Sequence, residues 1–390
     1  MVLNNPNTIV IACGGVGSRL KPVTEITPKP LLKINGIPFL ENILMQFAEV
    51  GARKFHLLLG YKYEEFIPRI DYWKKKFDLE ITFSISNIEC ETGERLIRSG
   101  IGGSSTLVFL YGDVFLPLNT EQRIELIHAK EPVIALYSGA YRNSSRNLKI
   151  VDNQLIDYLD KNSPEANAVN CGYFTITPEN YSQISPHTSV EDSILNFGKF
   201  RAISILNKYY TVGDVERLSQ ARNYFDKKRK ILLMDRDGTI TVANQPGDYL
   251  KSFHPEVLRI GVVEFLKKAR NYFDALIVIT NQPQVGNMKQ TYEEMLQVNT
   301  DLNRYLDSQD CGFDAFFICA HGWNEGCFCR KPNPGLMYDA QSFYDINWQN
   351  AVYIGDMKRD AIIAKTVDCE YRMIDSELGL VDQFGDELFT

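Results

Sequence analysis

Residues 231–239, ILLMDRDGT, join a short apolar run to a loop that holds two carboxylates and a glycine. A brief apolar run that ends at a turn signal is typical of a buried strand. Asp235 and Asp237 therefore lie in the loop after this strand, the position at which open α/β sheets bind their ligands. Two acids separated by one residue can divide their work, one attacking and the other protonating a leaving group. Taken alone, the stretch leaves an Asp-Gly turn with solvated acids as the alternative.

Two later apolar runs end in a similar way. Residues 276–281, LIVITN, close with a hydroxyl and an amide, and residues 352–356, VYIGD, close with Asp356. Between them Arg330 and Lys331 supply fixed positive charge. A nucleophile, oxygen donors, a counter-charge and a carboxylate for magnesium are the groups that phosphoryl transfer requires. The three strand ends together favour a phosphoryl-transfer site.

In the order of these motifs, from Asp235 to Asp360, this half of the chain resembles the haloacid-dehalogenase-type phosphatases. The resemblance implies a Rossmann-like domain in which Asp235 becomes phosphorylated, while Asp237 protonates the departing oxygen and later activates water. The other residues it implies are the phosphoryl- and substrate-binding groups, Thr280, Lys331, Asn281 and Arg330, and the magnesium ligands, Asp235, Asp237 and Asp356, with Asp360 in support.

Three cysteines and one histidine crowd into eleven residues, as Cys319, His321, Cys327 and Cys329. Three thiolates and an imidazole complete a tetrahedral zinc set and leave no position for a catalytic water, so we expect a structural Zn²⁺ site. Four unrelated buried residues are the alternative. The cluster resembles the phosphatase branch that acts on D-glycero-D-manno-heptose 1,7-bisphosphate, and a similar arrangement belongs to histidinol-phosphate phosphatase. Only five residues separate His321 from Cys327, which leaves the identity of the substrate open.

A second β-rich run, residues 8–12, TIVIA, ends in the glycine-rich stretch 13–20, CGGVGSRL. The third glycine of a dinucleotide-binding fingerprint is absent, which argues against a dehydrogenase. Lys29 follows, pinned between two prolines. The backbone N–H groups of a glycine loop, with Arg19 and Lys29 nearby, suit a triphosphate whose α-phosphorus is attacked. A glycine turn with surface cations is the alternative.

Over about residues 7–220 the chain resembles the sugar-1-phosphate nucleotidyltransferases, through GGVGSRL, PKPL and the Gly-Asp pair that ends at Asp113. The resemblance implies a Rossmann-like, glycosyltransferase-A-like sheet. It implies that Arg19 and Lys29 stabilise the pentacovalent phosphorus and that Asp113 binds Mg²⁺. The other residues it implies are the nucleotide-binding Gly14, Gly15, Gly17, Thr92 and Gly93, and, on the sugar-phosphate side, Lys161, Asn170 and Glu191.

One position departs from this family. Its members usually end in an Asp-x-Gly pair whose aspartate is a second magnesium ligand, and here Thr211 stands at that place in the run 210–214, YTVGD. A hydroxyl is a poorer ligand for a hard cation than a carboxylate. Three alternatives remain: Asp113 suffices with the phosphate oxygens, Asp214 substitutes, or the domain is weak or inactive.

The chain has 390 residues, and strands alternate with helices on both sides of a charged connector, residues 227–230, KKRK. This alternation predicts mainly parallel sheets with helical crossovers, so we expect two α/β domains, 1–226 and 227–390. A net charge of −7 argues against a general nucleic-acid coat. No apolar run approaches the roughly 18 residues of a membrane helix, and the start lacks the features of a signal peptide. We therefore expect a cytoplasmic protein, bound to neither nucleic acid nor membrane, whose partners are small molecules.

Together the two resemblances imply a bifunctional enzyme of nucleotide-sugar biosynthesis, for lipopolysaccharide or capsule. Its phosphatase removes the 7-phosphate of the heptose bisphosphate, and its transferase joins the heptose 1-phosphate to a nucleoside triphosphate, with GTP favoured. Thr211 keeps a second interpretation open, in which the amino-terminal half is a non-catalytic nucleotide-binding module. A third makes the chain a histidinol-phosphate phosphatase fused to an unrelated sugar-activating domain.

Overall fold

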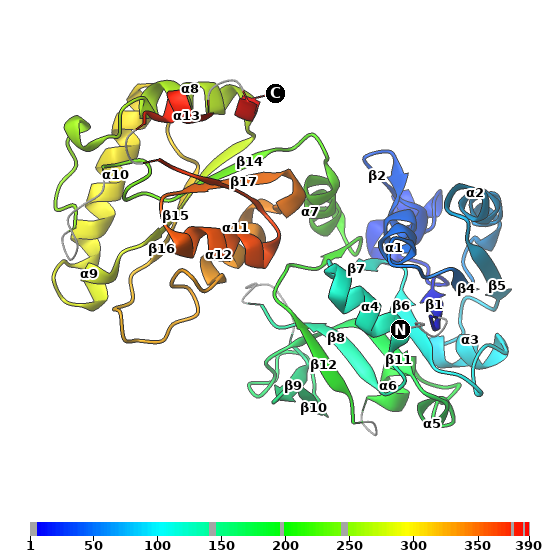
Figure 1. Cartoon of the computed structure of the whole chain (residues 1–390). Coiled ribbons are helices and arrows are strands. Elements are labelled where there is room, and N and C mark those ends of the chain that lie inside the picture. The colour runs from blue at the N-terminus through cyan, green and yellow to red at the C-terminus, as the bar shows by residue number, and fades with distance from the viewer. Residues whose placement is uncertain are drawn as a thin grey trace. The chain divides into compact units, whose positions relative to one another are not determined.

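The computed structural model describes residues 6–139, 146–195, 199–242, 249–375, 378–384 and 387–389 (Figure 1). The chain divides into two compact units, Met1–Arg222 and Asn223–Thr390. The division falls inside helix α7 (Val215–Phe225), slightly before the connector at which the sequence suggests a boundary. Each unit has its own sheet and its own buried core. Among the described residues, no helix combines the length and the hydrophobicity needed to cross a membrane.

Unit 1 is built on a nine-stranded mixed sheet. In spatial order its strands are β5 (Glu80–Ile85), β4 (Lys54–Leu59), β1 (Thr8–Ala12), β6 (Leu107–Tyr111), β11 (Val169–Ile176), β8 (Val133–Tyr137), β12 (Arg201–Ile205), β10 (Gln154–Tyr158) and β9 (Leu148–Val151). The first four are parallel, but β11 runs antiparallel to both of its neighbours. β9 and β10 form a hairpin through Asp152 and Asn153, whose φ angles of 48° and 58° suit a tight two-residue turn. The expectation of a mainly parallel sheet therefore holds for only part of this unit.

Helices pack on this sheet, and two short antiparallel ladders complete the unit (Figure 1). The helices are α1 (Phe39–Ala48), α2 (Ile67–Phe77), α3 (Thr92–Arg98), α4 (Thr120–His128), α5 (Pro178–Tyr181) and α6 (Val190–Ile194). The ladders are β2 (Lys33–Ile34) with β3 (Ile37–Pro38), and β7 (Val114–Phe115) with β13 (Tyr210–Thr211). Leu96 of α3 and Ile194 of α6 share a buried cluster with Val10 and Phe109 of the central strands, which fixes both helices to the sheet.

Unit 2 is built on a five-stranded sheet in which every strand is parallel, as the sequence predicts. In spatial order the strands are β16 (Ala315–Cys319), β15 (Ala275–Asn281), β14 (Ile231–Met234), β17 (Ala351–Gly355) and β18 (Glu370–Met373). Leu232 and Met234 of β14 belong to one buried cluster, and Ile231 and Leu233 belong to another. The helices are α8 (Val262–Tyr272), α10 (Tyr292–Ser308) and α13 (Leu380–Phe384) on the first face, α11 (Gly335–Tyr344) and α12 (Lys358–Val367) on the second, and the short α9 (Pro283–Gly286) after β15 (Figure 1).

The strand order brings the residues at the strand ends together. β14 lies between β15 and β17 and is parallel to both, so Met234 is in register with Val278 and with Ile354. The polar residues beyond these positions therefore meet at one edge of the sheet, where ligands bind in folds of this kind.

Candidate active sites

A buried lysine lies at the centre of the candidate site in unit 2. The Lys331 side chain is 0% exposed, and its Nζ lies 2.8 Å from Asp235 Oδ1 and 2.7 Å from Asp360 Oδ1. The same Nζ donates to the main-chain oxygen of Ile279 at 2.9 Å and to the Tyr353 hydroxyl at 3.0 Å. Tyr353 in turn donates to Asp360 Oδ1 at 2.9 Å. A buried ammonium needs such compensation because its removal from water costs several kcal/mol.

Three carboxylates meet beside this lysine. One oxygen from each of Asp235, Asp356 and Asp360 lies within 4.8 Å of the others. Burial raises the pKa of Asp235 to about 6, although Lys331 opposes the shift. Burial and the charge of Asp360 also raise the pKa of Asp356, whose Oδ1 is buried and has no hydrogen-bond partner among the described residues. Clustered carboxylate oxygens with an orphaned atom among them fit a hard divalent cation such as Mg²⁺.

Asp237 lies outside this group of three. The buried Arg236 guanidinium donates to Asp237 Oδ1 and Oδ2 at 2.9–3.1 Å, and Gln282 Nε2 donates to Oδ2 at 2.7 Å. The Arg236 main-chain N–H donates to Asp235 Oδ1 at 2.7 Å. Arg236 and Gln282 therefore orient Asp237, and no sequence motif indicated either residue. The role of Asp237 as a magnesium ligand stays a prediction.

The other residues predicted to hold phosphate lie at the same edge of the sheet. Thr280 is buried, and its hydroxyl accepts a hydrogen bond from Gln282 Nε2 at 2.7 Å. Asn281 Nδ2 donates to the Lys331 main-chain oxygen at 3.1 Å, and the Lys331 N–H donates back to Asn281 Oδ1 at 3.0 Å. Asn281 thus fixes the backbone that carries the lysine. Arg330 Nη1 is buried without a hydrogen-bond partner in the described parts of the chain, a state that suits an anionic ligand.

The cysteines and the histidine form a compact cluster at the end of β16. Cys319 Sγ lies 3.6 Å from both Cys327 Sγ and His321 Nδ1, and His321 Nδ1 lies 3.1 Å from Cys329 Sγ. All four ligand atoms lie within 4.8 Å of one another, and the thiols are free. Zn–S bonds of about 2.3 Å place the ligands of a tetrahedral site about 3.8 Å apart. The cluster therefore has the dimensions of one four-coordinate zinc site.

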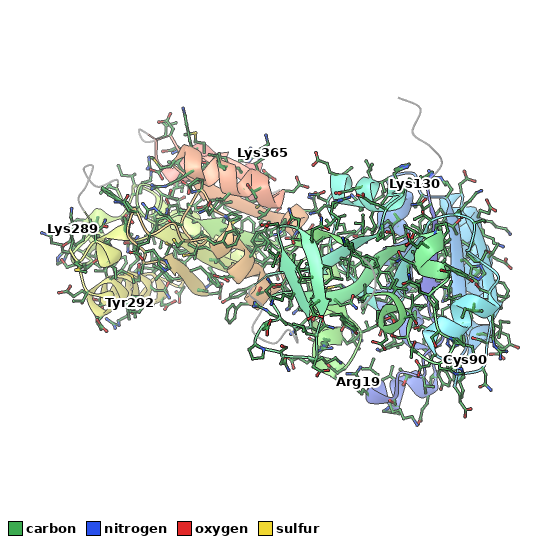
Figure 2. The ribbon with its side chains drawn as sticks, turned by 90° about the horizontal axis from the view of Figure 1, so that it is seen from below. Arg19, Cys90, Lys130, Lys289, Tyr292 and Lys365 are labelled. Atoms are coloured by element: carbon green, nitrogen blue, oxygen red, sulfur yellow. The ribbon has the colours of Figure 1, made fainter. Side chains whose placement is uncertain are left out.

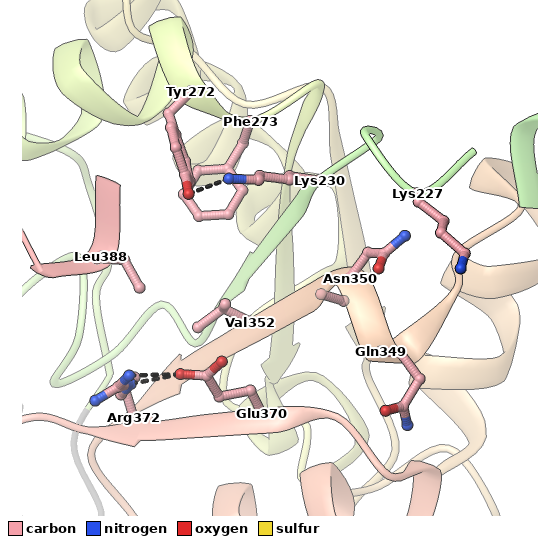
Figure 3. Close-up of a pocket in the computed structure, with 11 residues that line it drawn as sticks. Lys227, Lys230, Tyr272, Phe273, Gln349, Asn350, Val352, Glu370, Arg372 and Leu388 are labelled. Atoms are coloured by element: carbon pink, nitrogen blue, oxygen red, sulfur yellow. Dashed lines mark hydrogen bonds and ion pairs between the residues drawn. The ribbon is translucent and has the colours of Figure 1, made fainter. Parts of the chain in front are cut away.

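A pocket of about 260 Å³ lies at the opposite edge of the same sheet (Figure 3). Its lining includes Lys230, which precedes β14, and Asn350, which precedes β17, whereas Asp235 and Asp356 follow those strands. Lys230 Nζ lies 3.6 Å from the centre of the Tyr272 ring at the end of α8. A cation beside a helix carboxyl terminus is favoured by the helix dipole. This pocket is separate from the carboxylate group. The position of Lys230 is explained by the Tyr272 ring and the end of α8.

In unit 1 the glycine loop follows β1. A Cβ at position 14 would lie 2.1 Å from Arg95 Nη1, whereas nothing lies within 4 Å of the equivalent point at Gly15. Gly17 has a φ of 68°, which favours glycine. Arg95 is only 4% exposed and donates to Ser86 Oγ and to the main-chain oxygens of Leu59, Ile88 and Cys90. Arg95 fills the space behind the loop, and no sequence motif indicated it.

Lys29 and Asp113 form an ion pair in the same unit. Lys29 Nζ lies 2.5 Å from Asp113 Oδ2, and the two side chains are 13% and 28% exposed. Arg19 lies in the short helix η1 (Ser18–Leu20), with its side chain exposed (Figure 2). Of the three charged residues predicted to act on a triphosphate, the structure thus brings two into contact and exposes the third.

Thr211 lies next to Asp113, where a second magnesium carboxylate was expected. The pairing of β13 with β7 places Thr211 in register with Val114, the chain neighbour of Asp113. Thr211 Oγ1 is buried and has no hydrogen-bond partner among the residues that the structure describes. Asp214 is engaged elsewhere, since its Oδ1 accepts the Arg217 N–H at 2.9 Å in the first turn of α7. This geometry disfavours Asp214 as a substitute ligand.

The residues predicted for the base and the sugar form internal contacts. Glu191 accepts a hydrogen bond from the Tyr111 hydroxyl, and burial raises the pKa of Glu191. Thr92 Oγ1 accepts the first N–H of α6 at 3.0 Å. A Cβ at Gly93 would lie 2.2 Å from the Ser185 main-chain oxygen, so this glycine permits close packing of two backbones. These contacts connect the start of α3 with α6, next to the end of β6.

Two further predicted residues lie on the sheet half that contains β11. Asn170 Oδ1 accepts the Gly172 N–H at 2.8 Å inside β11. Lys161 lies in the loop before β11, and its side chain is exposed. Gly172 has a φ of 69°, and a Cβ there would lie 2.1 Å from the Tyr111 ring. Asn170 therefore helps to shape an irregular strand, while Lys161 remains accessible to solvent.

The two units are enzyme domains of different classes. Residues 8–147 match the family described as Nucleotidyl transferase, and residues 230–378 match the family described as Polynucleotide kinase 3 phosphatase. The chain therefore joins a nucleotidyltransferase domain to a haloacid-dehalogenase-type phosphatase domain, as the sequence motifs predict.

Individual relatives resemble one half of the chain. The probable glucose-1-phosphate cytidylyltransferase of Bacillus subtilis is 27% identical over 223 residues, which cover 51% of this chain and 87% of the relative. The D-glycero-beta-D-manno-heptose-1,7-bisphosphate 7-phosphatase of Bordetella bronchiseptica is 28% identical over 141 residues, which cover 36% of this chain and 77% of the relative. Against the bifunctional protein GlmU of Methanococcus maripaludis, 25% identical, the match spans 56% of this chain and about half, 54%, of the relative.

A solved structure resembles unit 1. HddC from Yersinia pseudotuberculosis, complexed with GMP-PN, is 24% identical with a TM-score of 0.47, and the match covers 56% of this chain and 100% of that chain.

Gly14→Ala should destabilise unit 1, and Gly15→Ala should leave its stability unchanged. The methyl group at position 14 meets the buried Arg95 guanidinium, and overpacking of this kind costs about 1–3 kcal/mol, whereas the methyl group at position 15 meets open space. Hydrogen exchange of the β1 and α3 amides in the two variants measures the free energy of local opening. Equal protection in both variants would contradict a role of Arg95 in supporting the loop.

Proposed function

We propose that the chain is a bifunctional enzyme of nucleotide-sugar biosynthesis. The phosphatase removes the 7-phosphate of D-glycero-D-manno-heptose 1,7-bisphosphate, and the transferase joins heptose 1-phosphate to a nucleoside triphosphate, GTP being favoured, with release of pyrophosphate. The observation that carries the proposal is the buried pair of Lys331 and Asp235 beside Asp356, whose buried Oδ1 lacks a partner among the described residues. The Bordetella relative supports the heptose bisphosphate as substrate.

In the phosphatase, Asp235 attacks the phosphorus while the bond from phosphorus to the sugar oxygen breaks, which leaves an aspartyl phosphate. Asp237 gives a proton to the departing oxygen and then takes one from the water that hydrolyses the aspartyl phosphate. Lys331, Thr280 and Arg330 offer N–H and O–H donors to the phosphoryl oxygens. When bound, Mg²⁺ would supply positive charge to the phosphoryl group, and Asp235, Asp356 and, in support, Asp360 would hold it.

Asp235→Asn should lower phosphate release by at least about a thousandfold and leave nucleotidyl transfer unchanged, because an amide cannot attack phosphorus and the two sites lie in separate units. Phosphate release is measured with the heptose bisphosphate and with histidinol phosphate, and pyrophosphate release with GTP and heptose 1-phosphate. Asp113→Ala is the reciprocal control and should show the opposite pattern. Loss of both activities in a folded Asp235→Asn protein would contradict the assignment of one activity to each unit.

The Cys319 cluster holds one structural zinc ion in this proposal. Its support is the tetrahedral spacing of three thiols and one imidazole, which leaves no position for a catalytic water. We also propose a cytoplasmic location, where a cysteine cluster of this kind favours a metal over disulfides. Zinc would tie the end of β16 to the segment that leads into Lys331, and would therefore act on stability.

Cys327→Ser should reduce bound zinc below one per chain and lower the thermal stability of unit 2, because one of the four ligands is lost. Metal analysis and thermal unfolding measure the two effects. Cys311→Ser is a matched control, since Cys311 is a buried cysteine of the same unit outside the cluster, and it should keep its zinc. Stoichiometric zinc in a chain with both Cys319→Ser and Cys327→Ser would rule out this site.

In the transferase, an oxygen of the sugar 1-phosphate attacks the α-phosphorus, and the bond to pyrophosphate breaks. The glycine loop offers backbone N–H groups. No described atom lies within 4 Å of the point where a Cβ of residue 15 would be, so a ligand has room there. Lys29 and Arg19 supply positive charge to the phosphates. Asp113, which is paired with Lys29, would hold Mg²⁺.

Thr211→Asp should lower the magnesium concentration for half-maximal transfer severalfold, because it adds a hard anionic oxygen beside Asp113. The buried and unpartnered Thr211 Oγ1 marks the position. Magnesium titration of pyrophosphate release from both proteins measures the effect.

A non-catalytic nucleotide-binding module is the second candidate function for unit 1, and the observation that favours it is Thr211 in place of a carboxylate. Absence of pyrophosphate release in wild type and Thr211→Asp, with each nucleoside triphosphate and heptose 1-phosphate, would contradict the transferase, and nucleotide binding by the same inactive protein would support the second candidate.

A further inference from the structure

The side chain of Gln282 is buried and fully hydrogen-bonded. It follows β15 and is 1% exposed. Its Nε2 donates to Asp237 Oδ2 and to Thr280 Oγ1, both at 2.7 Å. Its Oε1 accepts from Arg236 Nη2 and from Gln284 Nε2, both also at 2.7 Å. A primary amide has two donor hydrogens and two acceptor lone pairs, so all of its bonding capacity is used.

These partners allow only one orientation of the amide. A flipped amide would turn Oε1 toward the Asp237 carboxylate and its NH₂ group toward the Arg236 guanidinium, which places acceptor against acceptor and donor against donor. Arg236 is held further by Asn299 Oδ1 at 2.8 Å. The main-chain N–H of Gln282 donates to the Cys319 oxygen at 2.7 Å, so the backbone is also fixed, by the end of β16.

Arg236 alone cannot fix the position of the Asp237 carboxylate relative to the rest of the site. The two residues are neighbours in one loop, and Asn299, which also holds Arg236, ties that loop to α10 and not to the strand that carries Thr280. Gln282 belongs to a different segment, directly after the strand that carries Thr280. Its Nε2 is the atom that contacts both Asp237 and Thr280, and it therefore links the loop after β14 to the end of β15.

We propose that Gln282 is a positioning residue for the phosphatase reaction, holding the Asp237 carboxylate at a fixed place relative to Thr280. The proposal rests on the phosphatase function proposed above. A general acid assists only when it lies within hydrogen-bond reach of the leaving oxygen, and small displacements are costly to the rate. A carboxylate freed from Gln282 keeps its bond to Arg236 but loses its position against the bound phosphoryl group.

The dependence of the rate on the leaving group separates this role from a structural one. A sugar phosphate releases an alkoxide that needs a proton as the ester bond breaks, whereas p-nitrophenyl phosphate releases a weakly basic phenolate that needs little assistance. Gln282→Leu should lower kcat/KM about a hundredfold for the heptose bisphosphate and less than about tenfold for p-nitrophenyl phosphate, with KM for the sugar changed less than about threefold. A general loss of folded protein would lower both rates equally.

The experiment uses the full chain and two further variants. Gln341→Leu removes a buried amide of the same unit that donates to the Ile346 oxygen, and it should not change the ratio of the two rates. Gln282→Glu keeps the shape of the side chain but replaces the donor, and it should repeat the selective loss if the leucine variant does not fold. The wild type must first hydrolyse both esters. If the Gln282 variants then lose equal activity on both, or lose none, the positioning role is overturned. A wild type that hydrolyses neither ester would instead overturn the phosphatase function itself.

Discussion

The Lys331 ammonium, buried between two carboxylates, is the interaction on which the phosphatase half depends. Its partners come from four elements: the loop after β14 gives Asp235, β15 gives the Ile279 oxygen, β17 gives Tyr353 and α12 gives Asp360. An unpaired charge in such a place costs several kcal/mol, so a shift of the Asp235 loop or of α12 would leave a buried charge uncompensated, and a shift of β15 or β17 would remove a hydrogen bond from the ammonium. The parallel order β15-β14-β17 is thus coupled to a charge balance as well as to a hydrophobic core. The same coupling holds Asp235 in place before any substrate binds.

The grouped carboxylates at this site repel one another, and this repulsion suits a cation. Lys331 lies between Asp235 and Asp360, and the nearby Arg236 is already committed to Asp237. Burial and then the charge of Asp360 raise the pKa of Asp356, although Arg359 and Lys331 oppose the shift. A divalent cation relieves this repulsion, and an anionic phosphoryl group can then approach Asp235, which it could not do against three carboxylates alone.

The placement of polar residues at the strand ends was predictable from sequence because a strand end is a local signal. An apolar run that stops at Asp235, Thr280 or Asp356 places a polar group at the edge of a sheet, and parallel strands bring such edges together. Gln282 and Tyr353 were not predictable in this way, because a buried polar side chain shows its partner only in three dimensions. The sequence likewise carried no sign that β11 reverses direction, since the apolar pattern of a buried strand reads the same both ways. Arg95 was missed because arginines in helices are mostly exposed.

The charged residues of the two candidate sites differ in burial, and this difference affects how each site can bind a charged ligand. Lys331 is sealed from solvent, so its carboxylate partners are preorganised and cannot be exchanged cheaply. Lys29 and Asp113 are 13% and 28% exposed, so solvent reaches this pair but does not reach Lys331. In the proposed transferase, a triphosphate that attracts Lys29 and a cation that attracts Asp113 would separate this pair. The Lys29–Asp113 pair would thus rearrange as charged ligands enter, whereas the charged groups around Lys331 are in place beforehand.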